Sequence, residues 1–252
     1  MTTLKLDKIY KKYPNATHYS VEDFSIDIKD KEFIVFVGPS GCGKSTTLRM
    51  VAGLEEITEG KLYIDGEVVN DKSPKDRDIA MVFQNYALYP HMTVYENMAF
   101  GLKLRKYKKD DIDKRVREAA ASLGLTEFLD RKPADLSGGQ RQSITLLMAT
   151  MLRPELLLLD EHTAALDPKT AENVLQLTDK LVAEHNLTTL MITHNMRDAL
   201  RFGNRLIMMD AGRIIYDVKG EEKKQLTVAD LLQKFEVAGE NALSDRMVLG
   251  AK

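Results

Sequence analysis

The 252-residue sequence has one cysteine, no tryptophan and no long run of apolar residues. The single cysteine, Cys42, excludes an internal disulfide framework and is typical of a reducing compartment. No stretch approaches the ~18 consecutive apolar residues that a membrane-spanning helix needs. Residues 1–14 alternate charged and apolar side chains and lack the apolar centre of a signal peptide. These absences predict a soluble, cytoplasmic chain.

The sequence also lacks an excess of either charge, because 36 basic residues nearly balance 38 acidic ones. A balanced chain has no global field to attract nucleic acid, so we expect no nucleic-acid partner. Any anion that the protein binds must therefore be held by a local arrangement of donors. Apolar residues make up 44% and charged residues 29%, as in ordinary globular proteins, and the length allows one large domain or two small ones.

Hydrophobic patterns predict an α/β fold. Continuous apolar runs are typical of strands that are covered on both faces, and they occur at Phe33–Val37 and Leu156–Leu159. Two further strands are predicted at Thr189–Thr193 and Leu206–Met209. Alternating patterns predict half-buried antiparallel strands at residues 4–13 and 21–28, and a hairpin strand at 61–69. A charged helical pattern fills residues 94–152, and Asp167-Pro168 predicts the start of a helix that runs to about His185. The sequence therefore predicts an α/β unit with a helical insertion between its first two buried strands.

The residues Gly38–Ser45 match the phosphate-binding pattern G-x-x-x-x-G-K-S, between a buried strand and a helix. Glycines let the backbone wrap closely, so that successive N–H groups and the helix N-terminus converge on phosphate oxygens. Lys44 is expected to reach the β- and γ-phosphates, and the Ser45 hydroxyl to bind Mg²⁺. The alternative is a glycine-rich turn that matches by chance, which the strand-loop-helix context disfavours.

A pair of carboxylates, Asp160-Glu161, follows the second buried strand. A carboxylate at the tip of that strand suits water-mediated binding of Mg²⁺, and the next one can polarise an attacking water. An Asp-Glu pair alone often merely ends a strand. Beside a phosphate loop in the same chain, it predicts phosphoryl transfer from ATP to water, with Glu161 as the base.

A second anion-binding helix start is predicted at Leu136–Gln140, where a serine and two glycines present N–H groups. Taken alone, Ser-Gly-Gly could equally be a plain loop. Placed between the phosphate loop and Asp160-Glu161, these residues resemble the signature motif of the ABC-transporter ATPases. The resemblance extends over essentially the whole chain.

The resemblance implies a P-loop NTPase fold with a RecA-like core, an antiparallel β subdomain and an inserted α-helical subdomain. It also implies one domain over residues 1–252, in which 1–87 and 156–252 form the core and the β subdomain. Residues 88–155 then form the helical subdomain with the signature motif.

The resemblance assigns further roles to single residues. Gln84 matches the glutamine that senses Mg²⁺ and the attacking water, Asp167 falls in the D-loop, and His194 matches the switch histidine that contacts the γ-phosphate. Tyr13 falls where an aromatic ring stacks on adenine, although Tyr10 and Tyr19 compete for this role. The expected nucleotide-binding residues are Tyr13, Gly38, Pro39, Ser40, Gly41, Cys42, Gly43, Lys44, Ser45 and Thr46. The expected catalytic residues are Glu161, His194 and Gln84. The expected Mg²⁺ site is Ser45, Gln84 and Asp160. The signature that acts in trans is Leu136, Ser137, Gly138, Gly139 and Gln140.

The function that the resemblance implies is that of an ATP-hydrolysing subunit of an importer. Two such subunits pair head to tail, so that the signature of one closes over the ATP of the other. Closure and reopening drive a transmembrane permease, which places the chain on the cytoplasmic face of the inner membrane. The segment Tyr86–His91 would receive the permease. Two alternatives remain open: a soluble ABC ATPase that acts on DNA or ribosomes, and a nucleotide-binding scaffold without productive transport.

The sequence departs from one importer branch beyond Gln142. Up to that residue it resembles the ATPases of maltose and multiple-sugar importers. Residues 143–252 resemble a different importer branch, with His162 where proline is usual, and no regulatory domain of over a hundred residues follows Asp217. We therefore hypothesise a mosaic, natural or engineered, joined near the signature. The transported substrate is not encoded in this chain, because the permease and its binding protein select it.

Overall fold

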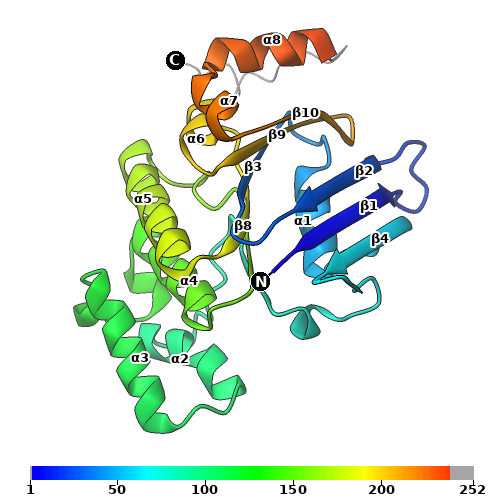
Figure 1. Ribbon diagram of the computed structural model, residues 1–252. Helices are drawn as coiled ribbons and strands as arrows, with labels where there is room; N and C mark the ends of the chain where they lie inside the picture. Colours follow the sequence, from blue (N-terminus) through cyan, green and yellow to red (C-terminus); the bar gives the residue numbers. More distant parts are fainter. Residues whose placement is uncertain (1, 239–252) are drawn as a thin grey trace. The chain divides into compact units, whose positions relative to one another are not determined.

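The computed structural model describes residues 2–238 (Figure 1). It divides into two compact units. Among the described residues, the sheet unit contains residues 2–81, the segment Glu155–Glu161 and residues 186–238. The helical unit contains Val82–Pro154 and His162–His185. The division of the chain expected from the sequence stays a prediction, and its part beyond Ala238 lies outside the described residues.

A six-stranded, mostly parallel sheet has the strand order β10-β9-β3-β8-β7-β6. β3 pairs in parallel with β8 and β9, β7 pairs in parallel with β8, and β10 is antiparallel to β9. The strands are β3 Phe33–Val37, β6 Ile79–Val82, β7 Leu156–Asp160, β8 Thr188–Ile192, β9 Arg205–Asp210 and β10 Arg213–Lys219. β3, β7, β8 and β9 are buried along their whole length, as the unbroken apolar runs of β3 and β7 predict for those two strands.

A second, antiparallel sheet has the order β2-β1-β4-β5. Figure 1 shows β1, β2 and β4 side by side. The strands are β1 Leu4–Lys11, β2 Val21–Ile28, β4 Glu59–Ile64 and β5 Glu67–Val68. The two strands predicted from alternating patterns are confirmed as β1 and β2, each with one buried face. β1 ends at Lys11 and not at residue 13. A turn at Asp65-Gly66 joins β4 to β5, and both residues have a positive φ.

The core of the sheet unit joins the two sheets through apolar side chains. Phe24 from β2 and Phe36 from β3 are both fully buried, with ring centroids 6.4 Å apart. Leu48 and Met50 from α1 and Leu158 from β7 belong to the same cluster. The helices of this unit are α1 Lys44–Ala52, α6 Met196–Arg201, α7 Gly220–Gln225 and α8 Val228–Ala238.

The helical unit is built from four α-helices, drawn in green to yellow in Figure 1. They are α2 Val94–Leu104, α3 Lys109–Ser122, α4 Gly138–Met151 and α5 Pro168–His185. α5 begins and ends where the sequence predicts. Thr93 caps α2 through a capping box with Glu96, which satisfies backbone donors at the helix start. Apolar residues such as Val116, Ile144 and Val174 are buried in this unit.

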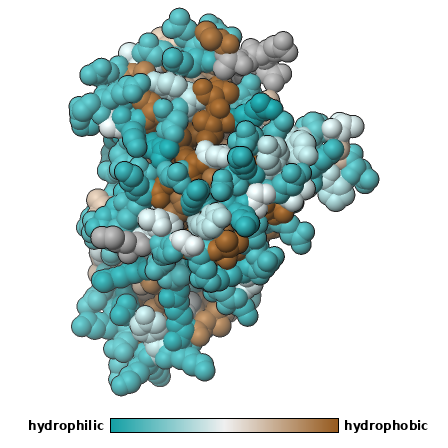
Figure 2. Space-filling model, turned by 45° about the vertical axis from the view of Figure 1, so that its right-hand side comes forward, coloured by the Kyte–Doolittle hydropathy of each residue, from teal (hydrophilic) through white to brown (hydrophobic). Residues whose placement is uncertain are grey.

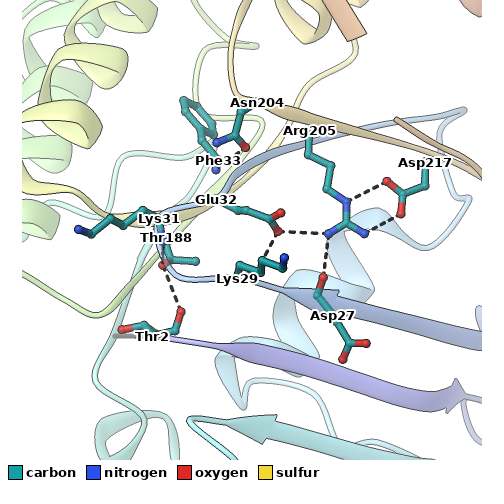
Figure 3. A network of polar contacts seen from close by, with 10 residues as sticks. All are labelled: Thr2, Asp27, Lys29, Lys31, Glu32, Phe33, Thr188, Asn204, Arg205 and Asp217. Atoms are coloured by element: carbon teal, nitrogen blue, oxygen red, sulfur yellow. Dashed lines mark hydrogen bonds and ion pairs between the residues drawn. The ribbon is translucent and has the colours of Figure 1, made fainter. Parts of the chain in front are cut away.

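Arg205 connects four segments of the sheet unit (Figure 3). Its guanidinium donates two hydrogen bonds to Asp217 on β10, at 2.6 and 2.8 Å. It also donates to the carbonyl oxygen of Asp27 at the end of β2 and to Glu32 just before β3. These bonds, with hydrogen bonding to Asp217 the main cause, raise the pKa of Arg205. A bidentate, largely buried arginine therefore holds β2, β9 and β10 at the start of β3.

The surface in Figure 2 is largely hydrophilic, with apolar residues gathered in limited patches. Within residues 2–238, no helix combines the length and the apolar character needed to cross a membrane.

Arg205→Ala should lower the free energy of unfolding by about 3 kcal/mol, because it leaves Glu32 and Asp217 without their buried partner. Urea unfolding followed by circular dichroism measures this change. Arg213→Ala is the matched control, because Arg213 pairs with Glu22 at 2.7 Å on the exposed side of the neighbouring strand. It should destabilise the protein much less than Arg205→Ala does, because exposed ion pairs contribute little to stability. Equal losses for the two variants would contradict the importance of the buried network.

Candidate functional site

The register of the parallel strands brings three chain segments to one edge of the sheet. Asp160 on β7 is paired with Ile192 on β8, and Ile192 is paired with Phe36 on β3. The residues that follow this row leave the sheet together at the carboxyl ends of the strands. They are the phosphate loop, Glu161 and His194, so residues more than 150 positions apart meet at this edge. The carboxyl edge of a parallel sheet is where α/β proteins bind ligands.

The phosphate loop has a backbone that requires glycine. Gly41 and Gly43 have φ of +82° and +101°, in the left-handed region that side chains rarely adopt. A Cβ on Gly43 would lie 2.4 Å from the carbonyl oxygen of Ser20, and one on Gly38 would lie 2.2 Å from that of Met209. Gly43 precedes α1, whose first N–H groups have no side-chain cap. The loop therefore wraps tightly and presents free N–H donors at the N-terminus of α1, a helix of nine residues.

Lys44 is buried and lies inside the loop. Its Nζ donates to the carbonyl oxygens of Gly38 and Pro39, each at 2.8 Å. Nζ also lies 3.6 Å from the Sγ of Cys42. Burial raises the pKa of the Cys42 thiol, and the ammonium of Lys44 acts in the opposite direction. Cys42 is therefore a small buried residue of the loop.

The turn between β9 and β10 supports the phosphate loop, which the sequence did not predict. Gly212 donates its N–H to the carbonyl oxygen of Cys42 at 3.1 Å and accepts from the N–H of Glu22 at 2.9 Å. A Cβ on Gly212 would lie 3.0 Å from the carbonyl oxygen of Ser20. Its φ of +82° suits only glycine. Ala211 and Gly212 both have a positive φ, and the contact of Gly212 with the loop exists only in the folded chain.

Each of the two carboxylates, Asp160 and Glu161, contacts another of the expected site residues. The Ser45 hydroxyl donates to Oδ1 of Asp160 at 2.8 Å, and Nε2 of His194 lies 2.6 Å from Oε2 of Glu161. Burial raises the pKa of Asp160, the bond from Ser45 lowers it, and the neighbouring charge of Glu161 raises it. Glu161 has a φ of +50°, an uncommon conformation at the sharp turn after β7. Two carboxylates, a hydroxyl and an imidazole thus lie near the N-terminus of α1.

Tyr13 lies in the loop between β1 and β2, where its ring is half-exposed. The Nζ of Lys11 lies 4.8 Å from the centre of this ring. The two competing tyrosines, Tyr10 and Tyr19, pack against each other edge to face, with centroids 5.5 Å apart. The same β1–β2 loop reaches the phosphate loop at Ser20. The adenine contact of Tyr13 stays a prediction, but its rivals are engaged with each other.

The helical unit contains the other predicted site residues. Gln84 is exposed just after β6. Ser137 caps α4 through a capping box: its Oγ accepts from the N–H of Gln140, and Oε1 of Gln140 accepts from the N–H of Ser137. The intervening N–H groups of Gly138 and Gly139 belong to the first turn, where no intrahelical acceptor exists. Asp167 caps α5 by accepting from the N–H of Thr170 at 3.1 Å.

His162 is buried in the helical unit, and a hydrogen bond to Thr178 satisfies its imidazole. The hydroxyl of Thr178 donates to the carbonyl oxygen of Val174 at 2.8 Å, so its oxygen accepts from Nε2 of His162 at 3.0 Å. Burial lowers the pKa of His162 to about 4, which keeps the imidazole neutral. Among residues 2–238, no group of three or more His, Cys, Asp or Glu side chains could hold a metal ion. The histidine therefore has a packing role.

The model of the ABC transporter family matches residues 21–164, so the chain belongs to this family. It is 63% identical over 211 residues to the multiple sugar-binding transport ATP-binding protein MsmK of Streptococcus mutans. It is 56% identical over 214 residues to the oligosaccharides import ATP-binding protein MsmX of Bacillus subtilis. These alignments cover 84% and 85% of this chain but only 56% and 58% of the relatives, so the chain spans little more than half of their length.

Solved structures resemble this chain along most of its length. A dimeric ATP-binding cassette, MJ0796, in a post-hydrolysis state with ADP and Pi has a TM-score of 0.75 at 34% identity. The match covers 86% of this chain and 98% of that one. A nucleotide-free ATP-binding cassette from an ABC transporter has a TM-score of 0.79 at 25% identity, over 95% of this chain and 100% of that one. The predicted fold class is confirmed.

The comparisons give the mosaic hypothesis no support. Both alignments to the sugar-importer relatives are longer than the part of the chain that precedes Gln142, so both continue past the expected junction.

Gly38→Ala should lower the free energy of unfolding by about 3 kcal/mol, because the new methyl group would overlap a backbone oxygen that cannot rotate away. Gly41→Ala is the control in the same loop: its Cβ meets nothing within 4 Å, so it should cost only about 1 kcal/mol of backbone strain. Urea unfolding of both variants without nucleotide measures the difference. An unchanged Gly38→Ala would show that the loop is not held against β9.

Proposed function

We propose that this chain binds ATP with Mg²⁺ and hydrolyses it, as the subunit that energises an ABC importer. The observation that carries the proposal is the pairing of Glu161 with His194 at 2.6 Å, at the sheet edge that also holds the phosphate loop. A carboxylate base held by an imidazole suits the activation of a water molecule. The neighbouring loop suits the phosphate that this water would attack.

The triphosphate would bind at the phosphate loop. The N–H groups of residues 40–46 and the N-terminus of α1 would surround its oxygens, and Lys44 would turn from two loop carbonyls to the β- and γ-phosphates. The exchange is feasible because Nζ is already inside the loop, so only its bonding partners change. The half-exposed ring of Tyr13 would stack on adenine.

Mg²⁺ would be held by Ser45 and Asp160, with Gln84 as the further ligand that the family resemblance implies. The Ser45 hydroxyl and the Asp160 carboxylate are hard oxygen donors, which Mg²⁺ prefers, and they are already 2.8 Å apart. When bound, the ion would neutralise charge on the phosphates. It would also stabilise the ionised form of Asp160, which burial disfavours in the protein alone.

Glu161 and His194 would divide the work on water. Glu161 would accept a proton from the attacking water, and His194 would hold the carboxylate in place and contact the γ-phosphate. The positive φ of Glu161 directs the chain sharply after Asp160, which separates the roles of the two carboxylates. Positioning and charge stabilisation account for most of the catalysis expected in phosphoryl transfer.

The active unit would be a head-to-tail homodimer. Ser137–Gln140 forms a capped helix start with free N–H groups, which suits an anion but has no catalytic carboxylate of its own. It would complete the site of a second copy. The dimeric cassette MJ0796 bound to ADP and Pi supports this assembly.

The membrane partner would be a permease for sugars. The relatives MsmK and MsmX are named for multiple-sugar transport and oligosaccharide import, which supports a carbohydrate as the class of cargo. The chain would then lie on the cytoplasmic face of the membrane, in contact with the permease through Tyr86–His91. The alternatives of a DNA- or ribosome-directed ATPase and of an inactive scaffold have no observation in their favour.

Lys44→Ala should weaken ATP binding about 10- to 100-fold, because it removes a charge-assisted phosphate contact of roughly 1.5–3 kcal/mol. Titration with a fluorescent ATP analogue measures the affinity. Lys72→Ala is the control, because Lys72 forms an ion pair with Glu67 away from the loop and should bind like the parent. Parent-like affinity for Lys44→Ala would refute the phosphate contact.

Glu161→Gln should keep ATP binding, lower turnover by about 10²- to 10⁴-fold and accumulate an ATP-bound dimer, because the amide cannot accept the proton. Phosphate release and size-exclusion chromatography with ATP give the two readouts. Glu155→Gln, at the exposed start of the same strand, should turn over normally. Normal turnover by Glu161→Gln would remove Glu161 from the role of base.

A further inference from the structure

The helix that begins with the signature motif, α4, is bonded to the preceding segment by Arg141, a side chain that does not belong to the signature. Arg141, in the second turn of α4, lies with its Cζ 4.9 Å from the ring centre of Tyr86. Its Nη1 donates to the carbonyl oxygens of Leu136, at 3.0 Å, and of Pro133, at 3.3 Å. The guanidinium therefore ties α4 to the segment that leads into it. That segment sets the direction from which Ser137 caps the helix.

Tyr86 also contacts the signature directly. A Cβ on Gly138 would lie 2.8 Å from the hydroxyl oxygen of Tyr86 and 3.2 Å from Cδ2 of Leu166. A Cβ on Gly139 would lie 2.3 Å from Cγ2 of Thr170, whose N–H is bonded to Asp167. The two glycines thus fit between Tyr86 on one side and the start of α5 on the other. This arrangement fixes the position of the free N–H groups at the helix start.

The ring of Tyr86 is a side-chain partner of the Arg141 guanidinium, beside the two backbone carbonyls. Within residues 2–238, the buried Nε of Arg141 has no hydrogen-bond partner. A guanidinium that faces an aromatic ring gains about 0.5–2 kcal/mol, with the larger value for desolvated pairs. Removal of the ring would leave a half-buried charge that two backbone carbonyls restrain, and the guanidinium could then change its position.

We propose that Tyr86 is a positioning residue for the signature motif, which acts through the contact of its ring with Arg141, whose guanidinium donates to the carbonyl oxygen of Leu136. It contacts no nucleotide of its own subunit in this role. Its effect is on the closure of the dimer and on the rate of hydrolysis, with no effect on ATP binding by the phosphate loop. The inference rests on the proposed function, in which the signature completes the site of a second copy.

The test compares Tyr86→Leu, which removes the ring, with Tyr86→Phe, which keeps it. Tyr86→Leu should lower kcat at least tenfold and abolish the ATP-bound dimer in a Glu161→Gln background. The affinity of the single subunit for a fluorescent ATP analogue should stay within twofold of the parent. Tyr86→Phe should recover most of kcat, because the ring face remains. If Tyr86→Phe loses as much as Tyr86→Leu, the ring is not the positioning element and the proposal is overturned.

Tyr107→Leu is the matched control. Tyr107 faces Arg115 at 4.9 Å, the same distance as in the Tyr86–Arg141 pair, but it precedes α3 and has no contact with the signature glycines. This variant should keep the parent kcat. If Tyr86→Leu lowers the melting temperature more than Tyr107→Leu does, Arg141→Gln provides a second route. It removes the cation but keeps a donor, and it should show the same loss of kcat with unchanged ATP affinity.

Ser137→Arg separates this proposal from the function on which it rests. A long side chain at the helix cap should block the signature and abolish turnover while ATP still binds. If Ser137→Arg turns over normally, the signature does not act in trans, and both the dimer mechanism and the role of Tyr86 fail. If Ser137→Arg is inactive but Tyr86→Leu and Arg141→Gln turn over normally, only the role of Tyr86 fails.

Discussion

The parallel register of β3, β8 and β7 is the constraint on which the site depends. Phe36, Ile192 and Asp160 form one row across the three strands. Because hydrogen-bonded strands advance together, the next residues of each strand leave the sheet at the same height. A shift of one residue would move every side chain to the opposite face and separate Glu161 from His194.

The phosphate loop is rigid because backbone groups surround it. Its glycines approach Met209 and Ser20 too closely for any side chain, and Gly212 bonds to its Cys42 carbonyl. Buried Lys44 adds two bonds from inside. The loop is therefore preorganised for an anion, so that little conformational entropy is lost when phosphate binds. The Arg205 network has a similar role further along, where it holds β9 and β10 to the start of β3.

The predicted site in the helical unit is stabilised differently from the phosphate loop, because side chains and not backbone groups surround the start of α4. A capping box sets Ser137 and Gln140, while Tyr86 and Thr170 limit the space around the two glycines. A smaller displacement is enough to alter a side-chain contact than to shift the register of a β-strand. A signature of this kind can thus be stabilised or misplaced through residues that lie outside it, such as Arg141.

The sequence by itself determined the elements and the local chemistry. Buried strands, the phosphate loop, the helix Pro168–His185 and the Asp160-Glu161 pair are local signals, since apolar periodicity and glycine spacing act over a few residues. The short strand β6, the contact of Gly212 with the loop and the Tyr86–Arg141 pair were not predicted. Each depends on segments that are distant in sequence, and only tertiary packing decides which of many exposed or polar residues become neighbours. The meeting of Glu161 with His194 could be expected from family resemblance, but only the sheet register brings the two atoms within hydrogen-bond distance.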